Sequence, residues 1–191
     1  MERTYIEDKD FEQIDFSLSK LAEGDYENCT FTNCNFSNND LSRISFSECN
    51  FLNCNLSMIK LTGTTLRDIQ FKGCKLLGLH FEDCSDFLFT VSFDNCILNL
   101  SSFYKRKLKK TIFKNTSLQE VDFTEADLSL AQFESCDLLG ATFVNAILEK
   151  ADFRTAYNYS IDPEMNRIKK AKFSVSGVAG LLNKYDVEVV G

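Results

Sequence analysis

The sequence contains very little of what most catalytic and metal sites are built from. Among its 191 residues there is one histidine (His80), one proline (Pro163) and no tryptophan. A single histidine leaves no multi-histidine metal site and little of the usual acid–base chemistry. No glycine-rich phosphate loop or nucleophile motif is present either. We therefore expect a protein that is not an enzyme, with no catalytic residues, cofactor or metal.

Long apolar runs are also lacking. No stretch approaches the ~18 apolar residues of a membrane-spanning helix, and the opening MERTYIEDKD is acidic and unlike a signal peptide. We expect a cytoplasmic protein without a membrane segment. Apolar residues still make up 44% of the chain, which is enough for a core.

What the chain does contain is a period of five. From Ile6 to Phe81, and again from Leu88 to Phe153, every fifth residue is Leu, Phe, Ile or Tyr. Two residues before most of these centres lies a small or β-branched residue, and the cysteines share that slot, with Cys84 keeping the rhythm into the interruption. Because this spacing is unlike a zinc motif, it predicts structural thiols that pack as small apolar groups.

A longer period of twenty lies within the period of five. Allowing for two extra residues near position 86, one column reads Phe11, Phe31, Phe51, Phe71, Phe93, Phe113, Phe133, Phe153 and Phe173. Neither a helix nor a flat strand keeps every fifth residue on one face. A chain that turns a corner every five residues does so. The two periods together predict a square β-solenoid of about eight coils, with four sides per coil.

The repeat unit resembles that of the pentapeptide-repeat family, whose pattern is A(D/N)LXX. Here the unit is seen as ADLSL at 126–130 and ADFRT at 151–155. The resemblance covers residues 6–173 and implies an all-β fold, a right-handed quadrilateral β-helix. We expect the solenoid to occupy residues 1–173, with a two-residue bulge near 84–90.

The C-terminal segment, residues 174–191, has a different pattern. Helical spacing with Ser176 as a candidate cap predicts a capping helix, and a valine-rich tail follows it, with Val187, Val189 and Val190. The preceding IDPEMNRIKKAKF, residues 161–173, resembles the quinolone-resistance (Qnr) and microcin B17 immunity branch of the family. That resemblance implies that the segment caps the rod and joins two rods into a homodimer. The expected dimer contacts are Val178, Leu181, Leu182 and Tyr185.

The same resemblance implies a partner, namely the type II topoisomerases DNA gyrase and topoisomerase IV, and a partial imitation of DNA. Duplex DNA as long as this rod, ~38 Å, would carry about 22 negative charges, whereas the net charge here is −7. Only a local acidic girdle over residues 120–152 approaches the charge density of DNA. An ordinary solubilising surface explains it equally well. Direct nucleic-acid binding is not expected. The girdle residues taken as candidate partner contacts are Glu120, Asp122, Glu125, Asp127 and Asp137.

The stretch CSDFLFTV, residues 84–91, interrupts the rhythm and contains the two phenylalanines that fall outside it. With Leu88 as the inward centre, Phe87 and Phe89 are expected to point outward. Lys107 and Lys109 lie one coil further along, so an aromatic pair above a basic patch is a candidate partner contact.

Two charged residues, Asp86 and Arg106, fall in slots that are inward elsewhere. They could form a buried pair, because a lone buried charge would be costly. Alternatively, Cys84 takes the inward slot and Asp86 lies outside on the bulge.

A second candidate surface lies on another side of the rod, where apolar residues fall in outward slots: Leu18, Met58, Leu77, Ile97, Leu100 and Leu139. Scattered exposed apolar residues are the competing interpretation of this apolar stripe. Two functions follow from these surfaces. The first is protection of a topoisomerase from a quinolone- or microcin-type inhibitor. The alternative is a generic scaffold or adaptor that binds another protein.

Overall fold

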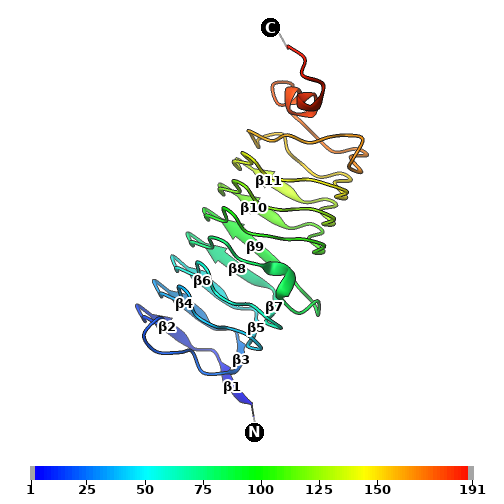
Figure 1. Cartoon of the computed structure of the whole chain (residues 1–191). Coiled ribbons are helices and arrows are strands. Elements are labelled where there is room, and N and C mark those ends of the chain that lie inside the picture. Colours follow the sequence, from blue (N-terminus) through cyan, green and yellow to red (C-terminus); the bar gives the residue numbers. More distant parts are fainter. Residues whose placement is uncertain (1–2, 189–191) are drawn as a thin grey trace.

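A computed structural model describes residues 3–188 of the chain, which form a rod of stacked coils (Figure 1). Two parallel sheets run along the rod, one strand per coil in each. The shorter sheet has the order β1-β3-β5-β7 and the longer one β11-β10-β9-β8-β6-β4-β2. The all-β parallel solenoid predicted from the repeat is therefore confirmed.

The strands are short because each occupies one side of a coil. Those of the shorter sheet are β1 (Thr4–Glu7), β3 (Gly24–Glu27), β5 (Ser45–Ser47) and β7 (Thr65–Arg67). Those of the longer sheet are β2 (Asp10–Glu12), β4 (Thr30–Thr32), β6 (Asn50–Leu52), β8 (Ile69–Lys72), β9 (Val91–Asp94), β10 (Ile112–Lys114) and β11 (Gln132–Glu134).

The other two sides of each coil are joined by isolated parallel bridges, for example Asn35 with Asn55 and Ser102 with Asp122. The register is twenty residues on every side and becomes twenty-two across the bulge, where Phe71 pairs with Phe93. Four columns of pairing in one register make the rod four-sided.

The core is a filled interior of stacked rings. Along the predicted phenylalanine column, from Phe11 to Phe173, successive ring centroids lie 4.6–5.4 Å apart with planes within 21° of parallel. Rings on the neighbouring sides meet this column edge to face, as Phe103 meets Phe113 at 6.0 Å. Both arrangements are favoured by aromatic rings.

The cysteines are free and buried among the residues described. Apart from that of Cys84, their thiols donate to backbone carbonyls; Cys54 Sγ, for instance, lies 3.2 Å from the Phe31 oxygen of the preceding coil. Burial raises the pKa of the Cys136 thiol to about 12, so it carries no thiolate near neutral pH.

Most corners of the rod have a left-handed residue two positions after the centre. Asparagine and glycine adopt this conformation readily and occupy many corners, such as Asn53 (φ 54°) and Gly140 (φ 69°). Leu100 adopts it at φ 62° with its side chain 60% exposed. A leucine in this conformation is strained and gains little from packing.

Replacing Leu100 with asparagine is therefore expected to stabilise the rod by about 0.5–1 kcal/mol, measured as a higher urea midpoint. The matched control is Leu98→Asn, two residues earlier at a fully buried centre, which should be strongly destabilising. A lower midpoint for Leu100→Asn would contradict the strain argument.

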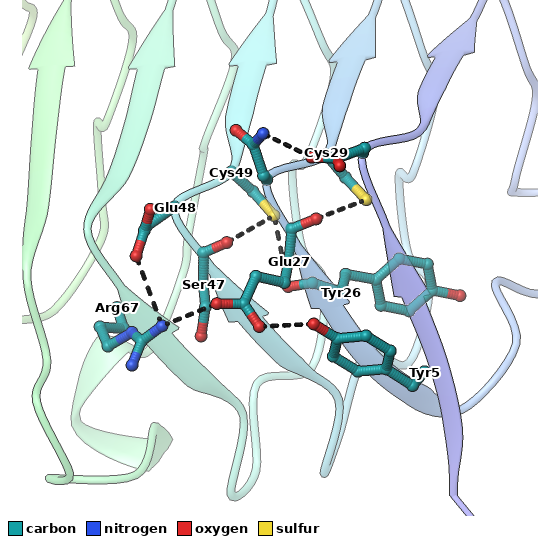
Figure 2. A network of polar contacts seen from close by, with 10 residues as sticks. Tyr5, Tyr26, Glu27, Cys29, Ser47, Glu48, Cys49 and Arg67 are labelled. Atoms are coloured by element: carbon teal, nitrogen blue, oxygen red, sulfur yellow. Dashed lines mark hydrogen bonds and ion pairs between the residues drawn. The ribbon is translucent and has the colours of Figure 1, made fainter.

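A polar network braces the first coils on one side of the rod (Figure 2). Arg67 Nη2 lies 3.3 Å from Glu27 Oε1, two coils away, and 3.6 Å from Glu48 Oε1. The Tyr5 hydroxyl donates to Glu27 at 2.8 Å, and this hydrogen bond raises the pKa of Tyr5 to about 12. The network ties four coils together and is structural in character.

The C-terminal segment lies beyond the last coil (Figure 1). The helix predicted there is not α-helical, because it consists of two 3₁₀ turns, η2 (Val178–Leu181) and η3 (Asn183–Tyr185). Ser176 does not cap it, since η2 begins after Gly177 without a side-chain cap. Val189 and Val190 of the predicted tail lie outside the described residues.

Close packing on Tyr159 explains why the segment is tightly turned. A Cβ on Gly177 or Gly180 would come within 2.3 Å of Tyr159 atoms. The Ile161 N–H also donates to the Gly180 carbonyl at 3.0 Å. Within residues 3–188, no helix has the length and apolar character needed to cross a membrane.

Candidate functional site

The bulge is where the chain leaves the coil outline. It begins with the 3₁₀ turn η1 (Phe81–Asp83), after which Cys84 points inward and is buried. Two apolar side chains then project into solvent, Phe87 with 68% and Leu88 with 53% of its surface exposed. This pair is the apolar tip of the bulge.

Arg106 anchors the bulge from inside the rod. Its side chain is only 4% exposed and pairs with Asp86, whose side chain is 97% exposed, at 2.7 Å. Its two terminal nitrogens also donate to the carbonyls of Cys84 (3.2 Å) and Ser85 (3.1 Å). Of the two arrangements left open by the sequence, the structure has the second, with Cys84 inward and Asp86 outside.

The prediction that Leu88 points inward and Phe89 outward is wrong. Leu88 is left-handed (φ 51°) and exposed. Phe89 is half-buried against the core, with its ring 6.3 Å from that of Phe81 and 4.0 Å from the Arg106 guanidinium carbon. An aromatic face stacks on a guanidinium, which a leucine side chain does not do. The buried guanidinium of Arg106 therefore favours Phe89, and not Leu88, at the inward position.

Leu88 is therefore a candidate contact residue that the sequence pattern did not indicate. The only signal for it was the interruption itself, because a repeat rule assigns no direction to inserted residues. Phe87 lies outside as predicted, and Phe89 is a supporting residue.

Basic residues follow one coil further along. Lys109 Nζ lies 3.3 Å from Asp127 and Lys105 Nζ lies 3.6 Å from Glu125. Lys107 is exposed and forms no ion pair within residues 3–188. Two of these lysines thus neutralise part of the acidic girdle, while Lys107 remains available to a partner.

The acidic girdle separates into two groups of residues. Asp122, Asp127 and Asp137 are half-buried, and each accepts the backbone N–H two residues later, at 2.8, 3.1 and 3.2 Å. This hydrogen bond closes a turn of the backbone, and it explains why aspartate or asparagine occupies the second position of the A(D/N)LXX unit. Glu120 and Glu125 are exposed at left-handed corners.

The pKa values of two of the aspartates reflect these hydrogen bonds. Burial acts to raise the pKa of Asp127, but hydrogen bonds from Ser129 and Lys109 outweigh it and leave the pKa below its usual value. For Asp137, burial is likewise outweighed, by hydrogen bonds from Gln119 and Asn158. The carboxylates of all three aspartates serve the turns, so the exposed glutamates are the more accessible part of the girdle.

The apolar stripe is exposed along much of the rod. Leu18, Met58, Ile97, Leu100 and Leu139 are exposed, and Leu77 is half-buried. The six residues come from five coils, because Ile97 and Leu100 flank the same centre, and two coils contribute none, so the stripe is discontinuous.

The C-terminal segment is fastened to the rod by an acid clasp. Lys184 Nζ lies 2.7 Å from Asp162 and 2.6 Å from Glu164, and the Tyr185 hydroxyl donates to Glu164 at 3.0 Å. Leu181 packs on the core of its own rod. Leu182 is half-buried, whereas Val178 and Tyr185 remain exposed together with Val175, which is 96% exposed.

Acid is expected to open this clasp. The Lys184 ammonium lowers the pKa values of both Asp162 and Glu164. Their contribution to stability is therefore complete above the ordinary carboxyl pKa, about 4, and is lost as the pH falls through the lowered folded values. The protection of the amides at residues 180–185, measured relative to their intrinsic exchange rates, should fall over that window. In Lys184→Met this protection should no longer change with pH, and a fall that persists in the variant would contradict the prediction.

Within residues 3–188, no group of three His, Cys, Asp or Glu side chains is arranged to hold a metal ion. His80 is an exposed residue that contacts Glu82 at 3.0 Å.

Comparison with known proteins places these features in a family. A family model described as "Pentapeptide repeat region" matches residues 24–85 and 87–157, so its interruption falls at Asp86 in the bulge. No curated protein sequence matches the chain.

Solved structures of the same architecture are similar to the chain. HetL from the cyanobacterium Nostoc, involved in heterocyst differentiation regulation, is 16% identical, with a TM-score of 0.59 over 92% of this chain and 88% of that one. Trypsin-treated QnrB1, a plasmid-mediated fluoroquinolone resistance protein, is 21% identical over 98% of both chains, with a TM-score of 0.48. The family model and the solenoid together show that this chain belongs to the pentapeptide-repeat family.

Proposed function

We propose that this protein is a cytoplasmic, non-enzymatic interaction module that protects a type II topoisomerase, gyrase or topoisomerase IV, from an inhibitor. The observation that supports a contact function is the apolar tip. Phe87 and Leu88 are exposed at the end of a bulge that the buried Arg106 holds in place. Arg106 contacts the carbonyls of Cys84 and Ser85, the carboxylate of Asp86 and the ring of Phe89. A rigid exposed aromatic is typical of an interaction hot spot, because little entropy is lost when it binds.

The choice of topoisomerase comes from the resemblance of residues 161–173 to the Qnr branch. DNA imitation, if it contributes, is confined to the exposed Glu120 and Glu125 and does not extend over the whole rod. The reducing cytoplasm suits a chain whose eight cysteines are free.

The test is a gyrase supercoiling assay with and without a quinolone. Wild-type protein should restore supercoiling, and the double variant Phe87→Ser with Leu88→Ser should fail to do so. The matched control is Leu100→Ser, which removes an equally exposed apolar side chain from the stripe. If wild-type protein neither binds gyrase nor changes drug-stabilised DNA cleavage, the topoisomerase proposal is wrong.

A second candidate function is an adaptor that binds another protein through the apolar stripe, supported by its exposed Met58, Ile97 and Leu100. In that case Leu100→Ser should abolish partner binding while the tip variant retains it. The two variants therefore separate the candidates.

We also propose a homodimer formed through residues 174–191. Val175, Val178 and Tyr185 supply its exposed apolar surface, while Leu181 and Leu182 support the segment on its own rod. Sedimentation of Val175→Asp should then give a monomer where wild-type protein gives a dimer. A monomeric wild-type chain would contradict the proposal.

A further inference from the structure

The N-terminal end of the rod is an open sheet edge. Strands β1 and β2 are the terminal strands of the two sheets, and among residues 3–188 each pairs on one side only. The opposite end of the rod carries the C-terminal segment. An unpaired edge is a template for a further strand.

The second coil shows which backbone groups face this end. The Thr30 N–H points towards the N-terminal end and donates to the Lys9 carbonyl of the first coil at 3.0 Å. The carbonyls of Glu27 and Thr32 accept from the first coil at 3.1 and 2.9 Å.

The first coil repeats this pattern twenty residues earlier. By that register the Asp10 N–H and the carbonyls of Glu7 and Glu12 face the open end, where residues 3–188 supply no further strand. These groups alternate along β1 and β2 as the edge of a parallel sheet requires.

Apolar side chains are uncovered at the same edge. Ile6, Phe11 and Ile14 are only partly buried, whereas Phe31, directly above Phe11, is fully buried. One face of each of these three side chains thus lacks the neighbour that the preceding coil provides elsewhere in the rod.

The charge at this edge is mainly negative. Five acids lie within residues 3–15 and none forms an ion pair within the described chain: Glu7, Asp8, Asp10, Asp15 and Glu12. Of the two bases there, Arg3 pairs with Asp25 at 3.0 Å and Lys9 lies over the Phe11 ring at 5.2 Å. Like charge opposes end-to-end pairing of two copies and favours a basic occupant.

We propose that the open N-terminal edge binds an extended, basic segment of another protein as an added β-strand. Asp10 and Glu12 flank the inward Phe11, so the fitting strand alternates basic and apolar residues. The added strand lies along β2, where its apolar side chain covers Phe11 and its lysines or arginines meet the flanking carboxylates. This site is separate from the bulge and does not depend on the topoisomerase proposal.

The probe is a fluorescent heptapeptide of alternating lysine and valine, with a glutamate–valine peptide for comparison, titrated with the full chain in fluorescence anisotropy. The lysine peptide should bind and the glutamate peptide should not. Asp10→Pro removes the free N–H without removing a bond to the second coil, and should weaken binding about tenfold. Asp10→Asn with Glu12→Gln should weaken it to a similar degree.

The matched control is Glu120→Gln with Glu125→Gln, which removes the same charge from the girdle and should leave the affinity unchanged. Absence of binding by the lysine peptide would overturn the proposal. So would an equal loss in the girdle variant, because the peptide would then respond only to net charge. Thermal melting of each variant establishes that the rod is folded.

Discussion

Replacing Phe113 with alanine is expected to lower the free energy of unfolding by about 3–5 kcal/mol. The ring is fully buried at mid-rod, stacked on Phe93 at 5.3 Å and on Phe133 at 5.0 Å. Its removal leaves a cavity that the fixed coil spacing cannot close. Because the stacking of Phe113 joins only adjacent coils, its loss should allow the two halves to begin to unfold separately.

Urea unfolding followed by circular dichroism measures both effects, as a lower midpoint and a broader transition. Phe87→Ala removes the same side chain from the exposed tip and should leave the curve unchanged. Equal losses in the two variants would contradict the assignment of inward and outward positions.

Replacing Arg106 with methionine is expected to release the bulge and to cost about 2–3 kcal/mol in local stability. Methionine fills much of the volume but leaves the carbonyls of Cys84 and Ser85 without their donor, and Phe89 without the cation beneath it. Asp86→Asn should be milder, because the Asp86 side chain is in solvent.

Amide exchange over residues 84–90 measures the release, which should far exceed any change in the outer coils. Arg154→Met is the control, since Arg154 pairs with Asp152 on the surface. If topoisomerase protection depends on a rigid tip, Arg106→Met should reduce it while the rod stays folded. An unchanged exchange rate in the bulge would show that Arg106 is not the anchor.

The fold was predictable because its rule is local and repeated. A period of five within a period of twenty specified the inward centres, the four sides and the register, and Phe71 still pairs with Phe93 across the bulge. Each repeat supplies the same information again, so one irregular unit does not disturb the whole.

The directions of Leu88 and Phe89 were not predictable in this way. Once two residues are inserted, the period no longer says which side chain turns inward. The choice depends on a residue in the next coil, because Arg106 is buried and the ring of Phe89 stacks on it.

The C-terminal segment shows a similar limit. Val178, Leu181, Leu182 and Tyr185 have the spacing of an α-helix, but the backbone follows the surface of Tyr159. Likewise, the repeat pattern predicts that Asp122 and Asp127 are ordinary surface charges. Only the turn geometry shows that each carboxylate accepts a hydrogen bond from the backbone N–H two residues later.

The inward-facing thiols give the rod a set of internal reporters. In the intact rod each one is buried, from Cys29 in the second coil through Cys84 at the bulge to Cys136 near the far end. A thiol reagent can reach a given cysteine only when the surrounding coil opens. The order in which the eight positions become labelled would therefore record how the rod comes apart, coil by coil, without any engineered probe.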